Sequence, residues 1–211
     1  MGEQSIEPSG LYETRASLYW WFSTLLTREL DEDQLARYTT GAGRALLDDL
    51  SEDPKFSPSV DKINRALAQI GPMEHPALEL AADFAELFLM DAKAGASPYA
   101  SVYQPDGGLL FQKPHDDMVA LLKSQGLAVE ARFNEPADHI AIQLDYLGNL
   151  IIKEGSQVSP AQATFIEQHL LSWIPQFVKS TEKVKNTGFY QGVCQLMLDF
   201  IELDHEEILA A

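Results

Sequence analysis

IAIQLDYLGNLI, residues 140–151, is the stretch of sequence that decides the fold. Its apolar residues Ile140, Leu144, Leu147 and Ile151 are separated by four, three and four positions. A helix with about 3.6 residues per turn places such residues on one face, where they can pack against a core. Strict alternation of apolar and polar residues, the pattern of a half-buried strand, is not sustained in any segment. The sequence therefore predicts an all-α protein without a β-sheet.

Proline and glycine residues indicate where the helices begin and end. Glu135-Pro136 and Ser159-Pro160 each put a proline at a first helical position, which its fixed φ suits. Gly155 suits the left-handed residue that follows a helix. We predict helices at 11–29, 31–50, 58–71, 76–92, 114–125, 136–154, 160–180 and 187–208.

Two stretches interrupt the helical pattern and divide the chain. Residues 94–113 form a loop of about twenty residues, and loops of that length within compact domains are often functional. Residues 126–135 follow the last helix before the second half. We therefore predict a helical bundle of two lobes, 1–125 and 136–211, joined by a hinge at 126–135. Opening of the hinge would let two copies exchange lobes, so we expect a monomer, a homodimer or both, the dimer domain-swapped.

The composition narrows the classes of partner. The 211 residues include 32 Asp and Glu against 15 Lys and Arg, a net charge of −17. Such a charge repels phosphate backbones and anionic lipids, so neither nucleic acid nor a membrane surface is an expected partner, whereas a basic peptide is attracted. Residues 1–8 are polar and acidic, unlike a signal peptide, and no apolar run approaches the roughly 20 residues that span a bilayer. We expect a cytoplasmic protein.

The densest polar cluster is Asn134-Glu135-Pro136-Ala137-Asp138-His139. With Pro136 as first helical residue, Asp138 takes the third helical position and can reach back to the N–H group that begins the helix. Alternatively, Asp138 and His139 face a groove, where the carboxylate receives a cation and the imidazole forms a pH-sensitive hydrogen bond. The spacing leaves both interpretations open.

The sequence gives little support for catalysis. His115, Asp116 and His139 are residue types that bind metals, and a helical metal-dependent hydrolase that uses them is the alternative function. No spacing that places two ligands on one helix face supports it, so we expect no metal site. No nucleophile elbow or phosphate-binding loop occurs, and the single cysteine, Cys194, lies in an apolar helix. We predict that the chain is not an enzyme, and we name no catalytic residue.

Aromatic residues precede and line the long loop. Phe84 and Phe88 lead into it, and Tyr99 and Tyr103 lie within it. Large side chains at a junction between a helix and a loop can form the floor of a groove for a peptide.

Three motifs together resemble one family. They are DFAELF at 83–88 with SPYASVY at 97–103, EPADHI at 135–140, and HLLSWIPQF at 169–177. Their order and spacing, within a helical frame, resemble the TorD family of molybdoenzyme chaperones, whose relatives include DmsD. The resemblance covers most of the chain, and it is strongest to the TorD branch.

The resemblance implies an all-helical cytoplasmic chaperone used in anaerobic respiration. Such a chaperone binds the immature apo-form of a molybdenum reductase, here trimethylamine N-oxide reductase, and its twin-arginine signal peptide. It assists insertion of the molybdenum cofactor before export. Guanine-nucleotide binding is also associated with the family, although no phosphate-binding motif is present, so we expect no cofactor.

The resemblance also implies partner-binding residues. In the loop and at the following helix start these are Pro98, Tyr99, Ser101, Tyr103, Glu135, Pro136, Asp138 and His139. The chemistry of a twin-arginine peptide fits them, because carboxylates bind guanidinium groups and aromatic side chains receive apolar ones. Glu135 and Asp138 would bind the arginines, and Phe84, Phe88 and Tyr99 the apolar stretch. A helical assembly subunit without a peptide groove is a third interpretation.

Overall fold

A computed structural model describes residues 8–90, 94–105, 108–127, 135–157 and 159–210. Throughout these ranges the regular structure is helical and no strand is formed, which confirms the all-α prediction. The one extended pairing in them is an isolated antiparallel bridge between Tyr99 and His139. Within the same ranges, no helix combines the length and the apolar character needed to cross a membrane.

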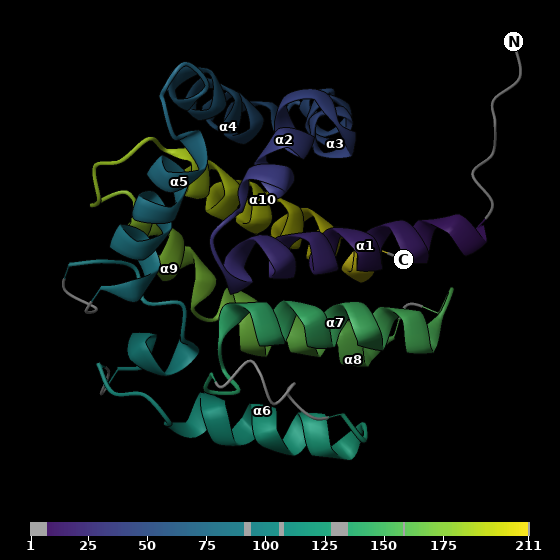
Figure 1. Ribbon diagram of the computed structural model, residues 1–211. Coiled ribbons are helices and arrows are strands. Elements are labelled where there is room, and N and C mark those ends of the chain that lie inside the picture. The colour runs from purple at the N-terminus through teal and green to yellow at the C-terminus, as the bar shows by residue number, and fades with distance from the viewer. Residues whose placement is uncertain (1–7, 91–93, 106–107, 128–134, 158, 211) are drawn as a thin grey trace, which may run out of the picture. The chain divides into compact units, whose positions relative to one another are not determined.

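The α-helices are shown in Figure 1. They are α1 (Pro8–Thr27), α2 (Glu32–Thr40), α3 (Ala42–Ser51), α4 (Ser57–Ile70), α5 (Pro76–Phe84), α6 (Lys113–Ser124), α7 (Ile140–Glu154), α8 (Pro160–Phe165), α9 (Ile174–Thr181) and α10 (Phe189–Ala210). Two π-helical segments, η1 (Ala85–Leu89) and η3 (Ile166–Leu171), continue α5 and α8, and a 3₁₀ turn, η2 (Ala100–Tyr103), lies in the long loop.

The chain forms two compact units that are interleaved in sequence. Unit 1 combines Met1–Leu26, Tyr99–Ser172 and Asp204–Ala211, and unit 2 combines Thr27–Pro98 and Trp173–Leu203. Each unit therefore contains segments from both halves of the chain, whereas each predicted lobe is one continuous stretch of sequence. Most of the predicted hinge at 126–135, residues 128–134, lies outside the described residues, so the hinge stays a prediction.

In unit 1 the predicted face of α7 forms part of the core. Ile140, Leu144, Leu147 and Ile151 are each 0 % exposed. A Cβ atom on Gly148 would lie 2.6 Å from the indole Nε1 of Trp20, so a glycine is needed where α1 and α7 meet. Figure 1 shows α7 running beside α8, against which it packs.

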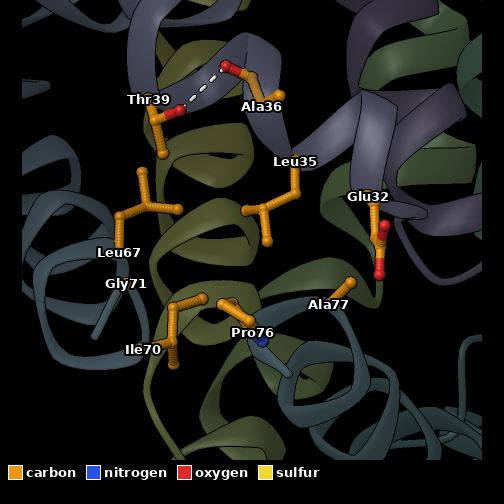
Figure 2. A pocket seen from close by; sticks show the side chains of 9 residues that line it. All are labelled: Glu32, Leu35, Ala36, Thr39, Leu67, Ile70, Gly71, Pro76 and Ala77. Carbon is orange, nitrogen blue, oxygen red and sulfur yellow. Dashed lines mark hydrogen bonds between the residues drawn. The ribbon is translucent and has the colours of Figure 1, made fainter. Parts of the chain in front are cut away.

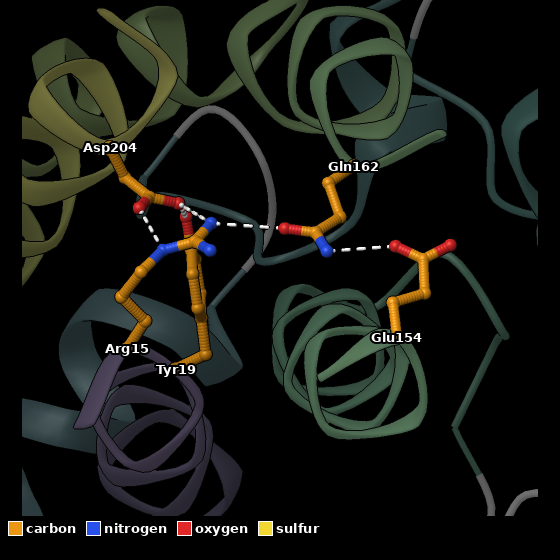
Figure 3. A network of polar contacts seen from close by, with 5 residues as sticks. All are labelled: Arg15, Tyr19, Glu154, Gln162 and Asp204. Atoms are coloured by element: carbon orange, nitrogen blue, oxygen red, sulfur yellow. Dashed lines mark hydrogen bonds and ion pairs between the residues drawn. The ribbon is translucent and has the colours of Figure 1, made fainter. Parts of the chain in front are cut away.

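A polar network also joins the helices of unit 1 (Figure 3). Arg15 of α1 forms a two-pronged ion pair with Asp204 of α10, at 2.5 Å from Nε to Oδ1 and 2.9 Å from Nη2 to Oδ2. The Tyr19 hydroxyl donates to the same carboxylate at 2.8 Å, and Arg15 Nη2 donates to Gln162 Oε1 at 3.1 Å. Gln162 Nε2 in turn donates to Glu154 at 2.8 Å. Four helices thus share one chain of charge-assisted hydrogen bonds.

Unit 2 is built around a cluster of aromatic rings. Phe84 and Phe88 lie edge-on to Tyr190, with ring centroids 5.2 and 5.7 Å apart, and Phe88 stacks on Phe177 at 6.0 Å. Such edge-to-face pairs stabilise a core beyond the burial of their area. The Tyr190 hydroxyl accepts from the backbone N–H of Leu30 at 3.3 Å, so its one polar atom is paired.

Two of the predicted helices are each divided in the structure. The helix predicted at 31–50 is two helices, because Gly41 adopts an extended conformation between them, with φ −113° and ψ −158°. A Cβ atom at this position would lie 2.9 Å from Arg37 Cα, so the break depends on the glycine. The helix predicted at 160–180 changes to a π-helical segment at Ile166 and is interrupted at Trp173, where ψ is −29° and φ is −142°.

Candidate functional site

The start of α7 defines the candidate site. The helix begins at Ile140, not at Pro136 as predicted, because residues 136–139 form a turn in which His139 N donates to Pro136 O at 3.0 Å. His139 is the N-cap, and its Nδ1 accepts from Ala141 N at 3.1 Å. Imidazole here replaces the hydroxyl or carboxylate that caps most helices.

Because α7 starts at Ile140, Asp138 lies before the cap and cannot reach back within its own helix as predicted. Its side chain is 0 % exposed, and Oδ2 instead accepts from the backbone N–H of Ser101 at 2.7 Å. The backbone oxygen of Asp138 accepts from Ala100 N at 3.2 Å. The second carboxylate oxygen, Oδ1, is buried with no hydrogen-bond partner among the described residues. Asp138 therefore attaches the long loop to the start of α7.

Tyr99 and Glu135 complete this attachment. The Tyr99 hydroxyl donates to Glu135 Oε2 at 2.6 Å, and the Tyr99 ring lies edge-on to His139 with centroids 5.1 Å apart. Burial, together with the hydrogen bond to Glu135 and its charge, raises the pKa of Tyr99, so the phenol stays protonated and donates. The orientation of the Glu135 carboxylate is thus fixed by a neighbouring phenol.

The beginning of α6 joins the same assembly. Ser101 Oγ accepts from Gln112 N at 3.1 Å, and His115 Nδ1 accepts from Ala137 N at 2.9 Å. Sequence reasoning considered His115 only as a metal ligand and missed its contact with residue 137, which only the folded chain brings into reach. We call the set of Tyr99, Ser101, His115, Glu135, Asp138 and His139 the polar junction.

The residues of the polar junction differ in their access to a partner. Among the predicted site residues of unit 1, Tyr99, Tyr103 and Glu135 are partly exposed. Ser101, Pro136, Asp138 and His139 are buried. The partly exposed residues can touch a ligand, while the buried ones hold them in place. The structure thus brings the predicted loop residues and the predicted helix start together.

The remaining predicted site residues, Phe84, Phe88 and Pro98, belong to unit 2. Phe84 and Phe88 are each 5 % exposed within the aromatic cluster, and Pro98 is buried. Contact of these rings with a peptide would require the cluster to open, so their role in binding stays a prediction. The exposed apolar residues of this segment are Leu89 and Met90, at 69 % and 53 %.

The geometry gives the hydrolase alternative no support. The Nδ1 atoms of His115 and His139 both accept hydrogen bonds from backbone N–H groups. In the described part of the chain, no three His, Cys, Asp or Glu side chains are grouped so that they could hold a metal ion.

Unit 2 carries a separate apolar pocket of about 270 Å³ (Figure 2). Leu35 of α2, with Leu67 and Ile70 of α4, forms its apolar wall, and Glu32 lies at one side. Pockets that enclose whole small molecules usually measure about 300–1,000 Å³, so this volume suits a side chain better than a cofactor.

Unit 1 presents a carboxylate and phenols on a hydrogen-bonded frame, and these are groups with which a protein can bind another molecule. Comparison with known proteins supports a binding role. The family described as nitrate reductase delta subunit matches residues 53–179. The TorD chaperone of Ferrimonas balearica is 44 % identical over 97 % of this chain and 94 % of its own length. That of Aliivibrio fischeri is 43 % identical over 94 % and 96 %.

The fold is also found in a solved structure. A chain described as a redox enzyme maturation protein, from Archaeoglobus fulgidus, aligns over 94 % of both chains with a TM-score of 0.51 and 17 % identity. At that identity the likeness concerns the fold alone. From the closer relatives, the chain belongs to the TorD family of molybdoenzyme maturation chaperones. This is a family of chaperones, which confirms the prediction that the chain is not an enzyme.

Proposed function

We propose that this chain is a cytoplasmic chaperone for trimethylamine N-oxide reductase. It binds the immature reductase and its twin-arginine signal peptide, and it assists insertion of the molybdenum cofactor before export. Relatives at 44 % and 43 % identity that are named TorD chaperones support this assignment. The structural observation that carries it is the partly exposed Glu135 carboxylate, held by Tyr99 at the polar junction.

The chemistry of a guanidinium group suits Glu135. A carboxylate can accept at about four positions, and the bond from Tyr99 uses one of them. The remaining capacity allows a charge-assisted hydrogen bond to an arginine of the peptide. The net charge of −17 attracts that peptide over longer distances.

Asp138 has a different role in this proposal from the one predicted. Its carboxylate is 0 % exposed and is bonded to Ser101 N, so it positions the loop and does not meet the arginine. His139 is likewise buried and caps α7. The direct contacts are therefore assigned to Glu135, Tyr99 and Tyr103.

Calorimetric titration with a synthetic twin-arginine signal peptide tests the site. Glu135→Gln should weaken binding about tenfold or more, because it removes one charge-assisted hydrogen bond. Glu167→Gln is the matched control, since Glu167 is an exposed residue of the same unit and its substitution changes the net charge equally. An equal loss of affinity in both variants would show that Glu135 acts only through long-range attraction. Absence of binding to the native chain would refute the proposal.

The identity of the reductase is tested in the native cell. Affinity purification of the chain from anaerobic cultures, each supplied with a different electron acceptor, should recover apo trimethylamine N-oxide reductase when that oxide is the acceptor. Recovery of another molybdoenzyme would show that the target is different. Cell fractionation should place the chain in the cytoplasm.

The proposal includes the predicted monomer and domain-swapped homodimer, and it requires no resident cofactor. Light scattering over a range of concentrations should detect both species. A single monomeric mass at every concentration would exclude the dimer. Titration with GTP should give no heat of binding, and a saturable heat would add a nucleotide to the proposed function.

A further inference from the structure

Three consecutive apolar side chains in the long loop of unit 1 are exposed. Leu109, Leu110 and Phe111 are 65 %, 40 % and 61 % exposed, and we call them the apolar tip. Single exposed apolar residues are ordinary on protein surfaces, but contiguous ones often mark a place where another molecule binds.

The backbone of the tip is held in an uncommon conformation. Phe111 has φ +58°, in the left-handed region that bulky residues rarely adopt. Neighbouring contacts hold it there, since Gln112 N donates to Ser101 Oγ at 3.1 Å and the Phe111 ring lies edge-on to His115 at 5.0 Å. These contacts therefore hold the tip in its exposed position.

The same contacts connect the tip to the polar junction. Ser101, which receives the bond from Gln112, is also bonded to Asp138 at 2.7 Å. His115, against which Phe111 packs, accepts from Ala137 N at 2.9 Å. Two short routes thus connect the tip to the segment that carries Glu135, and both lie within unit 1.

We propose that the apolar tip receives the apolar stretch that follows the arginines of the signal peptide. This inference rests on the proposed function. It adds to the carboxylate that binds the arginines a second, apolar part of the same site. A carboxylate connected to exposed apolar side chains through Ser101 and His115 matches the combination of charged and apolar residues in such a peptide. The tip replaces Phe84 and Phe88 in that role, because their rings are packed within unit 2.

The test uses calorimetry on the full chain with two probes. One is a synthetic twin-arginine signal peptide, and the other is the same peptide with its apolar residues replaced by serine. Leu109→Ser and Phe111→Gly remove apolar surface from the tip, and glycine adopts the positive φ of residue 111 without strain. The matched control is Leu78→Ser in unit 2, because Leu78 and Leu109 are both 65 % exposed.

Each tip variant should weaken binding of the intact peptide about tenfold, the order expected for loss of one buried large apolar side chain, and should change binding of the serine peptide little. Thermal unfolding followed by circular dichroism should be unchanged for Leu109→Ser, because that side chain is exposed. For Phe111→Gly the same measurement reports the balance between the lost ring contact with His115 and the relief of backbone strain, and it separates a change in stability from a change in binding. Leu78→Ser should have no effect on either probe.

Four outcomes would overturn the inference. Equal weakening of both probes would show that the tip does not contact the apolar stretch. Weakening by Leu78→Ser, with the tip variants silent, would place that stretch beside the pocket in unit 2, since Leu78 follows the pocket residue Ala77. Tight binding unaffected by any variant would refute the tip alone, whereas failure of the intact peptide to bind the native chain would refute the proposed function as well.

Discussion

Two pairs of side chains from the family motifs, Phe84 with Phe88 and Asp138 with His139, are fixed in place by different forces. In unit 2, Phe84 and Phe88 are held by packing among aromatic rings, which is strong and non-directional. In unit 1, Asp138 and His139 are held by hydrogen bonds to single N–H groups, which are weaker but directional. The comparison suggests that the aromatic segment supplies stability, while the polar segment supplies the orientation that a binding site needs.

The largest expected effect on stability comes from truncation of an aromatic side chain in the segment 83–88. Phe88→Ala should lower the free energy of unfolding by about 3–5 kcal/mol, because it leaves a cavity among the rings of Tyr190 and Phe177. Urea denaturation measures it. Leu89→Ala, at a neighbouring residue that is 69 % exposed, is the control and should cost less than about 0.5 kcal/mol. A loss below about 1 kcal/mol at Phe88 would mean that the cluster relaxes to fill the space.

A smaller loss of stability is expected from substitutions in the polar segment, residues 135–139. Asp138→Ala should cost about 1–3 kcal/mol, because Ser101 N then loses its acceptor. Asp138→Asn keeps an acceptor oxygen and should cost less. Denaturation of both variants, followed by calorimetry with the signal peptide, separates stability from orientation. Equal stability of the alanine variant and the native chain would show that the bond from Ser101 is replaceable.

The pH dependence of stability sharpens the comparison further. Burial lowers the pKa of His139 from 6.5 to about 3, so between these values the unfolded chain binds a proton that the folded chain does not. This contribution therefore lowers stability as the pH falls through that window, by roughly 1 kcal/mol for each pH unit well below 6.5, and it does not change with pH above that value. His139→Asn keeps a capping side chain and should flatten the profile obtained by denaturation at successive pH values. An unchanged slope in this variant would show that other groups cause the pH dependence.

The smallest expected effect on stability follows from the removal of one hydroxyl group. Tyr99→Phe removes the donor to Glu135 Oε2 but keeps the ring against His139. We expect a loss of about 0.5–1 kcal/mol in stability. If the phenol orients the carboxylate, the same variant should also weaken peptide binding, and calorimetry would detect this. Loss of stability with unchanged binding would assign Tyr99 to the fold alone.

The sequence predicted local features well and long-range ones poorly. The face of α7 followed from periodicity, since residues such as Leu144 and Leu147 are each 0 % exposed. The start of α7 was missed because Pro136 suits a first helical position, whereas the bond between Asp138 and Ser101 requires a turn there. No local pattern records that bond, which joins residues 37 positions apart.

The candidate site shows the same division. The motifs identified the loop and the helix start, and the structure brings them together at Tyr99 and Glu135. Burial of Phe88 could not be read from the sequence, because the rings that cover it come from the distant residues Phe177 and Tyr190. The exposure of Phe111 had no sequence signal either, since an apolar residue in a loop is equally compatible with burial.

The ion pair between Arg15 and Asp204 has a consequence for how the chain is made. The two residues are 189 positions apart, so at about 5–20 residues per second the ribosome adds Asp204 roughly 10–40 s after Arg15. Throughout that interval the guanidinium lacks the carboxylate that pairs with it in the folded chain, and burial of an unpaired charge is costly. We therefore expect α1 to dock only near the end of translation, so that this chaperone completes its own folding after most of its chain has been synthesised.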